Sequence, residues 1–244
     1  MKKDYQHIVI LTGAGISAES GLATFRAANG LWNNHPVEDV ATIEAFQRNP
    51  AYVHDFYNEL KPLLNAAKPN PAHMAITKLQ HEYPAKISII TQNVDTLHEK
   101  AGSQNIYHIH GQINQAVCLN CGHVLETFTD VDTETTCPHC QVCGMMKPNI
   151  VFFGENLLYM DEVDKLLHQC DLFISVGTSG VVFPAASFVQ IAKYYGAETY
   201  EFNLELTSNN LYFDHPRADG YKLFPRSHIR KSGRNAPPLY RRID

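Results

Sequence analysis

The chain has 244 residues, of which 44% are hydrophobic, and a formal net charge of −5 at pH 7. This length suits one large domain that carries a smaller insert. The mild, dispersed negative charge argues against a nucleic-acid groove or an anionic membrane surface as the main partner. No apolar run approaches the roughly 20 residues of a membrane span, and the first residues do not resemble a signal peptide. We therefore expect a soluble, cytoplasmic protein.

Short apolar runs alternate with helical stretches along most of the chain. Asn70 is placed to cap one helix, and Gly196 is placed to stop another. Strands that alternate with helices predict an α/β fold with a Rossmann-like, doubly wound parallel sheet. The expected strands are residues 7–11, 86–91, 171–176 and 198–204, and the expected helices are residues 71–83, 161–169 and 184–195.

Two stretches break this alternation. Residues 41–64 have a helical pattern, and residues 118–143 have no helical period and many Cys, Thr and Asp. We expect both to form a smaller zinc-binding and helical second domain. The expected large lobe is residues 1–35, 70–112 and 150–225, the small lobe is residues 36–69 and 113–149, and the basic, proline-broken residues 226–244 form an atypical tail.

A glycine-rich turn follows the first expected strand. Such a junction holds a pyrophosphate in doubly wound proteins, because glycines let the backbone approach and free N–H groups donate to phosphate. The third glycine comes later than in the G-x-G-x-x-G pattern, so a tight turn without a ligand is the alternative. The residues concerned are Gly13, Ala14, Gly15, Ile16, Ser17, Glu19, Ser20 and Gly21.

Phe25, Arg26 and Trp32 come soon after this turn. An arginine can pair with phosphate, and an aromatic ring can cover a flat ligand ring. The alternative is that Phe25 and Trp32 are core residues and that Arg26 is solvated.

Gln92, Asn93, Val94 and Asp95 follow the second expected strand. Ligands bind at the carboxyl ends of strands in open parallel sheets, where these polar side chains could bind ribose hydroxyls and a carboxamide. Helix capping by Asn93 or Asp95 is the alternative. His110 ends a short alternating segment and is a candidate general base, because histidine titrates near neutrality. Most of the 13 histidines are expected to be surface or structural residues.

Two C-x-x-C pairs, Cys118 with Cys121 and Cys137 with Cys140, lie on either side of a short polar insert. Four thiolates form the tetrahedral site that zinc prefers and leave no open position, so one zinc ion would be structural. His139 and Cys143 are further potential ligands, and a redox dithiol is the alternative. Cys170 stands apart; we expect it to be buried and assign it no role.

In the order and content of these motifs the chain resembles the sirtuins. The match runs in family order from the first strand to about residue 205. The matching segments are Gly13-Ala14-Gly15-Ile16-Ser17, Ser20-Gly21, Phe25-Arg26, Asn70-Pro71-Ala72-His73, Thr91-Gln92-Asn93-Val94-Asp95 with Leu97-His98, His110-Gly111, the two cysteine pairs, residues 147–155, Gly177-Thr178-Ser179 with Val182 and Pro184, and Asn203-Leu204-Glu205.

The resemblance implies that NAD+ is a co-substrate and gives each motif a role. The glycine turn would hold the pyrophosphate, Phe25, Arg26 and Trp32 would lie at the nicotinamide end, and residues 92–95 would bind nicotinamide and its ribose. His110, Asn93 and Asp95 would be catalytic. The adenosine side would be lined by Gly177, Thr178, Ser179, Asn203, Leu204 and Glu205. An extended substrate peptide would contact Phe153, Gly154, Glu155, Gly180, Val181 and Val182, and Tyr57 would line the pocket for the acyl group.

The implied activity is NAD-dependent protein lysine deacylation, most simply deacetylation, with nicotinamide and O-acyl-ADP-ribose as products. The partner would be an acylated-lysine protein or peptide, with no nucleic acid or membrane partner, and we expect a monomer. Some relatives that remove acidic acyl groups carry a Tyr-x-x-Arg pair. Here Tyr57 is retained but Leu60 takes the arginine position, which favours neutral acyl groups. Lys61 could replace that arginine only if the helix were turned.

Three other functions remain as alternatives. NAD-dependent ADP-ribosyl transfer would use the same co-substrate with another acceptor. A non-enzymatic NAD-sensing module would bind the dinucleotide without consuming it. A hydride-transfer dehydrogenase fits less well, because the glycine turn departs from the dehydrogenase pattern.

Overall fold

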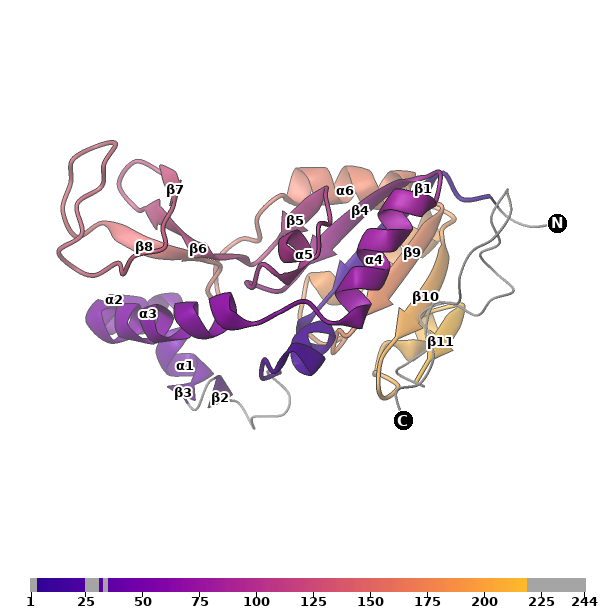
Figure 1. Cartoon of the computed structure of the whole chain (residues 1–244), viewed down its shortest axis with the longest axis horizontal. Coiled ribbons are helices and arrows are strands. Elements are labelled where there is room, and N and C mark those ends of the chain that lie inside the picture. Colours follow the sequence, from indigo (N-terminus) through magenta and orange to yellow (C-terminus); the bar gives the residue numbers. More distant parts are fainter. Residues whose placement is uncertain (1–3, 25–30, 33–34, 219–244) are drawn as a thin grey trace.

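The computed structural model describes residues 4–24, 31–32 and 35–218, and only the backbone of Leu31 and Trp32. Its largest sheet has six parallel strands within these residues, in the spatial order β11-β10-β9-β1-β4-β5 (Figure 1). The strands are β1 (His7–Thr12), β4 (Lys86–Thr91), β5 (Ile106–His108), β9 (Leu172–Val176), β10 (Glu198–Phe202) and β11 (His215–Arg217).

The strand order reverses beside β1. After β1 the chain adds β4 and β5 on one side, and then returns to add β9, β10 and β11 on the other. Adjacent loops at such a switch point leave the sheet in opposite directions and open a crevice at the carboxyl ends of the strands. The turn after β1 and the turn after β9 flank this crevice.

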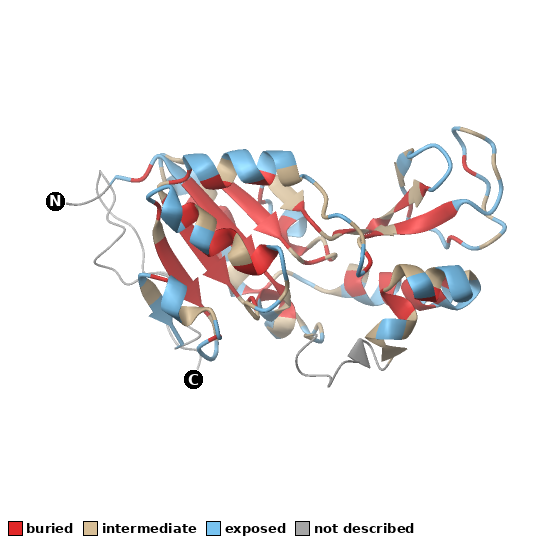
Figure 2. Ribbon diagram, turned by 180° about the vertical axis from the view of Figure 1, so that it is seen from behind, coloured by how far each residue is buried: buried red, intermediate tan, exposed pale blue. Residues whose placement is uncertain are grey.

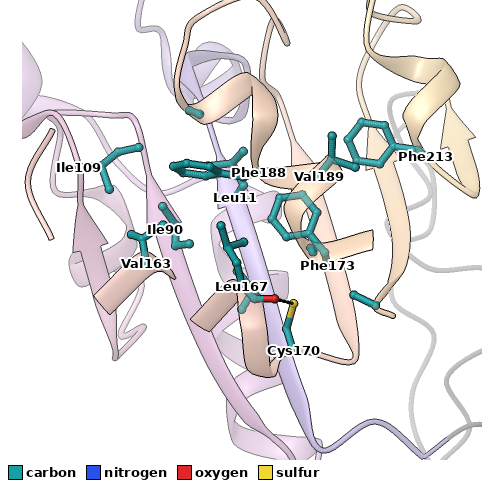
Figure 3. Close-up of a cluster of buried hydrophobic side chains, with 14 residues drawn as sticks. Leu11, Ile90, Ile109, Val163, Leu167, Cys170, Phe173, Phe188, Val189 and Phe213 are labelled. Carbon is teal, nitrogen blue, oxygen red and sulfur yellow. Dashed lines mark hydrogen bonds between the residues drawn. The ribbon is translucent and has the colours of Figure 1, made fainter. Parts of the chain in front are cut away.

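Helices cover both faces of the sheet. Helices α6 (Met160–Gln169) and α7 (Phe188–Tyr194) pack on one face, where Phe173, Phe188 and Leu167 belong to a buried cluster (Figure 3). Helix α4 (Pro71–Glu82) packs on the other face, with Ile76 and Leu79 against strand residues. The inner strands β1, β4, β9 and β10 are buried along most of their length (Figure 2), as expected for a parallel sheet between helical layers. The expected doubly wound α/β fold is therefore confirmed.

A second, smaller group of elements lies beyond the carboxyl end of β5 (Figure 1). It has its own buried cluster, in which Phe56 and Tyr57 from a helix meet Ile113 and Phe152. A three-stranded antiparallel sheet, in the order β7-β6-β8, extends toward the cysteines. The elements of this smaller group, with the three strands of the sheet included, are β2 (Leu31–Trp32), β3 (His35–Pro36), α1 (Val37–Val40), α2 (Ile43–Arg48), α3 (Pro50–Ala66), β6 (Gly111–Cys118), β7 (Val124–Glu126) and β8 (Met146–Ile150).

The remaining elements are short. They are η1 (Ala14–Ser20), α5 (Leu97–Lys100), η2 (Ala185–Ser187) and η3 (Asn210–Tyr212). Among the described residues, no helix is long and apolar enough to cross a bilayer.

The structure differs from the expected elements at several boundaries. The helical stretch at residues 41–64 is divided at Asn49, because the Asn49 side chain caps α3 by accepting from the Tyr52 N–H and Pro50 begins that helix. The helix expected at residues 184–195 starts as the 3-10 turn η2, and α7 begins at Phe188. Strand β10 ends at Phe202, two residues early. The edge strand β11 was not expected.

Candidate active site and metal centre

A large cleft lies at the carboxyl ends of the parallel strands, with a volume of about 1030 Å³. This size is at the upper end for a small-molecule site. Its walls come from η1, from the loops after β4, β9 and β10, from residues 150–157, and from Ala41 and Leu64 of the smaller group of elements. A ligand in this cleft would therefore contact both parts of the molecule.

The glycine turn after β1 packs directly against the backbone of Gly177 after β9. The Gly15 N–H donates to the Gly177 carbonyl at 2.8 Å, and a Cβ built on Gly15 would lie 2.7 Å from that oxygen. Gly177 itself has a φ of 64°, in the left-handed region that favours glycine. Only glycines allow these two turns to approach so closely, and their contact forms the floor of the cleft at the switch point.

Asn70 joins the glycine turn to α4. Its side-chain oxygen accepts from the Ala72 N–H at 2.9 Å and so caps the helix. Its amide Nδ2 donates to the Ile16 carbonyl at 2.6 Å and to Ser20 Oγ at 3.0 Å. The sequence predicted that Asn70 caps the helix but not that it binds the glycine turn. Asn70 and Ile16 are 54 residues apart in the chain, and a contact at that separation leaves no local sequence pattern.

Asn93 and Asp95 are buried in the loop after β4 and share Ser17 as a partner. The Ser17 hydroxyl donates to Asp95 Oδ2 at 2.9 Å and accepts from Asn93 Nδ2 at 3.2 Å. The Leu97 N–H donates to Asp95 Oδ1 at 3.0 Å. Burial raises the pKa of Asp95, and its hydrogen bonds from Leu97 and Ser17 oppose that shift. This loop is thus connected to the glycine turn by side-chain hydrogen bonds.

His110 lines the cleft beside this loop. Its Nδ1 lies 2.9 Å from the Gln92 carbonyl oxygen, which can only accept, so Nδ1 carries the proton. A neutral ring then has its lone pair on Nε2. Burial lowers the pKa of His110, against a smaller opposite effect of the Gln92 hydrogen bond. The ring is therefore neutral near pH 7 and has one nitrogen available to take a proton.

Two further histidines, His73 and His98, lie buried behind the site. His98 Nε2 is 3.0 Å from the Thr12 hydroxyl, which itself donates to Thr91, so His98 Nε2–H is the donor. The two rings stand edge to face with centroids 5.0 Å apart. Burial lowers the pKa of His73 to about 4 and that of His98 to about 3. Both rings are neutral and belong to the interior that supports the site.

A buried lysine organises the segment that follows β8. Lys147 Nζ donates to both carboxylate oxygens of Glu155, at 3.0 and 2.8 Å, and to the Ile150 carbonyl. Glu155 also accepts from the Phe152 N–H at 2.7 Å. Burial lowers the pKa of Lys147, and the Glu155 carboxylate opposes this shift. The ion pair and these hydrogen bonds hold the backbone of residues 150–155 in a turn. In the sequence, the only sign of this role is that Lys147 is a charged residue next to apolar residues.

The structure brings most of the expected site residues to the cleft. Those that line it are Gly13, Ala14, Gly15, Ile16, Ser17, Glu19, Gln92, Asn93, Val94, Asp95, His110, Phe153, Gly154, Glu155, Gly177, Thr178, Ser179, Val182, Asn203, Leu204 and Glu205. The described residues that do not line it are Ser20, Gly21, Tyr57, Gly180 and Val181.

Tyr57 is 1% exposed and packs on the Phe152 ring in the interior of the smaller part. Phe25, Arg26 and the Trp32 side chain lie outside the described residues. The cleft also has lining residues that the sequence did not indicate, among them Leu22, Leu157, Met160 and Thr207. The sequence could not indicate Leu22, Leu157 and Met160, because isolated apolar residues are equally typical of the hydrophobic core.

The four expected zinc ligands lie together. Cys118, Cys121, Cys137 and Cys140 have sulfur atoms within 4.8 Å of one another. The Sγ–Sγ distances are 3.6 Å for Cys118–Cys140 and 3.9 Å for Cys121–Cys137. A tetrahedral zinc site with Zn–S bonds of about 2.3 Å has sulfur atoms roughly 3.8 Å apart, so these four thiols fit the ion.

The two extra candidates do not join this cluster. Cys143 is exposed and its thiol donates to the Glu134 carbonyl, and His139 stacks on His123. Cys170 is buried at 4% exposure among the apolar side chains under α6, as expected (Figure 3).

Comparisons with known proteins match most of the chain. The Sir2 family model matches residues 13–184. An NAD-dependent protein deacylase of Vibrio cholerae is 52% identical over 207 residues, which cover 84% of each chain. The NAD-dependent protein deacylase SIR2rp3 of Leishmania major is 53% identical over 211 residues, covering 84% of this chain and 87% of that one.

Solved structures show the same fold. A Sir2 homologue in complex with NAD has a TM-score of 0.80 at 36% identity, covering 88% of this chain and 84% of that one. A Sir2 protein with a p53 peptide and NAD+ has a TM-score of 0.73 at 32% identity, covering 88% of each chain.

Proposed function

The chain belongs to the Sir2 family, and on that premise we propose that the central cleft binds NAD+ and an acylated lysine and that His110 is the general base. The activity is NAD-dependent protein lysine deacylation. Its products are the free lysine, nicotinamide and O-acyl-ADP-ribose.

The neutral His110 ring is the observation that carries this proposal. Because Nδ1–H is held by the Gln92 carbonyl, Nε2 is the nitrogen that can accept a proton at the cleft. When bound, NAD+ would supply the ribose carbon that bonds to the acyl oxygen of the modified lysine as nicotinamide leaves. His110 would take the proton from a neighbouring ribose hydroxyl, so that this oxygen can attack the acyl carbon, and water would then release the free lysine amine.

The remaining lining residues are proposed to bind the two substrates. The glycine turn would donate N–H groups to the pyrophosphate, Asn93 and Asp95 would hold nicotinamide and its ribose, and Asn203 and Glu205 would lie near the adenosine. The turn at Phe153 and Glu155, closed by Lys147, would hold the substrate peptide by backbone hydrogen bonds. We propose that the chain divides into the two lobes expected from the sequence and that the cleft lies between them, because residues of both expected lobes line it.

Zinc is proposed to be structural, held by Cys118, Cys121, Cys137 and Cys140. Four sulfur ligands leave no open position for a reacting group. Cysteines stay reduced most readily in the cytosol, so the four metal-binding thiols support a cytoplasmic location. We further propose that the protein acts on acylated proteins as a monomer. Its net charge of −5 favours the absence of a nucleic acid or anionic membrane partner.

Neutral acyl groups are the proposed substrates. Leu60 is buried at 4% exposure and offers no partner for an acyl carboxylate. Lys61, the other candidate on α3, directs its Nζ to the Thr129 carbonyl at 2.5 Å. We predict that purified protein removes acetyl groups much faster than succinyl groups from the same peptide. Equal rates in a peptide assay would contradict this preference.

The function is tested by mass spectrometry of the products formed from NAD+ and an acetyl-lysine peptide. The wild type is expected to release nicotinamide and O-acetyl-ADP-ribose in equal amounts. His110→Asn keeps a side-chain N–H for the Gln92 carbonyl but has no base, so turnover should fall by roughly 100-fold or more while NAD+ binding is retained.

Two outcomes would favour other functions. ADP-ribose attached to protein, without loss of the acetyl group, would indicate ADP-ribosyl transfer. NAD+ binding without consumption by either protein would indicate a non-enzymatic sensing module.

A further inference from the structure

His108 lies two residues before the proposed base and is held at both ring nitrogens. It is 2% exposed, its Nδ1 is 2.9 Å from the Asn93 carbonyl oxygen, and its Nε2 is 2.7 Å from Glu99 Oε1. A carbonyl oxygen and a carboxylate can only accept, so both ring nitrogens must donate. The two contacts together require the doubly protonated, positively charged ring.

We propose that the His108 imidazolium, paired with Glu99, is a positioning residue that holds the loop at residues 92–95 in the shape that binds NAD+. This inference rests on the proposed function of the cleft. It adds a charged pair behind the cleft to the residues that line it, since neither His108 nor Glu99 lines the cleft.

The position of His108 in the sheet explains how it can act on this loop. Strand β5 pairs with β4 so that His108 lies opposite Thr91, the last residue of β4. The ring therefore contacts the Asn93 carbonyl from the side of the loop that faces away from the cleft. On the cleft side, Asn93 Nδ2 donates to the Gly13 carbonyl at 3.2 Å. Asn93 is thus held between His108 and the glycine turn, and loss of either partner would free it to move.

The charge of His108 also acts on the carboxylates near it. Burial raises the pKa of Asp95, and the positive charge of His108 is among the effects that oppose this rise. Burial also opposes ionisation of Glu99, but the hydrogen bond and charge of His108 are sufficient to lower the pKa of Glu99 below its usual value. His98, on the same short helix as Glu99, has its pKa lowered to about 3 and is neutral. The groups facing His108 are therefore the Glu99 carboxylate, the Asp95 carboxyl group and the neutral His98 ring.

His110 provides an internal contrast. It also donates from Nδ1 to a carbonyl of this loop, but no carboxylate of the described residues is bonded to its Nε2. The two histidines thus have different charge states at neighbouring positions: one ring is neutral and can accept a proton, and the other is charged and structural. Glu99 is the group that distinguishes them.

The charge is tested with Glu99→Gln. Glutamine can hydrogen-bond to Nε2 but does not require a second proton on the ring. With ¹⁵N-labelled histidine at pH 7.5, we expect the wild-type His108 nitrogens to have the chemical shifts of an imidazolium and those of the variant to have the shifts of a neutral ring. A neutral His108 ring in the wild type would overturn the proposal, whatever the activity of the protein.

The positioning role is tested by steady-state kinetics. We expect Glu99→Gln and His108→Asn, which keeps an N–H near the Asn93 carbonyl, to raise the KM for NAD+ by roughly threefold or more, with the KM for the acetyl peptide changed by less than twofold. Glu162→Gln on the exposed face of α6 is the matched control and should change neither constant. Unchanged NAD+ KM in both variants would overturn the inference, whereas a wild type without deacylation would reject the proposed function instead.

Discussion

Three histidines near the cleft differ in charge because their partners differ. Burial keeps His110 neutral against the opposing effect of the Gln92 carbonyl, Glu99 makes His108 cationic, and burial alone keeps His73 neutral. The sequence indicated His110 only through its place beside a glycine at the end of a short alternating segment and through the family resemblance. It could not indicate the charge of any of these rings. The charge depends on contacts that only the fold creates, such as Glu99 beside His108 and the Gln92 carbonyl beside His110.

The buried histidines predict acid sensitivity of the folded state. The pKa values of His73 and His98 fall to about 4 and about 3, below the usual value of 6.5. The unfolded chain therefore binds two protons that the folded chain does not, and stability is lost as the pH falls below 6.5. We expect these two rings to lower the free energy of unfolding by about 3 kcal/mol between pH 7 and pH 5, measured by urea denaturation.

His98→Gln provides the matched variant for this prediction. Its side-chain amide can still donate to Thr12 but cannot titrate in this range. The histidine-dependent loss between pH 7 and pH 5 should then be about half as large. The same loss of stability in both proteins would contradict the assignment to these rings.

At the scale of elements, the pattern of apolar residues predicted most strands of the large sheet and the helices that cover it. Buried strands are short apolar runs, and the covering helices have apolar residues at helical spacing. The apolar pattern did not predict β11, whose three residues, His215 to Arg217, are partly or fully exposed at the sheet edge and show no apolar run. It also missed the division at Asn49, because the helical pattern continues across this residue, although Asn49-Pro50 has the same cap-and-proline signature as Asn70-Pro71.

The cysteine-rich segment, residues 118–143, has a small core, and we expect it to need metal to fold. Its buried cluster is Ala116, Cys118, Val131, Cys137 and Met146, and two of these are proposed zinc ligands. Asn58 and Lys61 of α3 contact its loop through the Val131 backbone and the Thr129 carbonyl. We predict that a strong chelator removes one zinc per chain, exposes residues 119–145 to protease and abolishes deacylation.

The variants Cys143→Ser and Cys118→Ser test which cysteines bind zinc. Cys118 belongs to the four-cysteine cluster, and Cys143 does not. The first variant should bind one zinc and remain active, because the Cys143 thiol lies outside the cluster and donates to Glu134. The second should lose zinc in a colorimetric metal assay. Zinc loss in both variants would show that Cys143 is a ligand.

At the scale of the whole molecule, the cleft is assembled from segments that are far apart in the chain, from the turn at Gly13 to the loop at Glu205. Strand–helix alternation predicted that these loops would meet at one edge of the sheet. The ordered set of motifs indicated which residues of each loop would be used. Neither could predict Asn70 or Lys147 as links, because their role comes from partners such as Ile16 and Glu155 that only the folded chain brings near.

The most direct measurement is a crystal structure of the protein with NAD+ and an acetyl-lysine peptide analogue that does not react. The account predicts the nicotinamide ribose in the cleft, with a hydroxyl at about 3 Å from His110 Nε2. A bound dinucleotide whose ribose lies far from that ring, with His110 facing solvent, would contradict it.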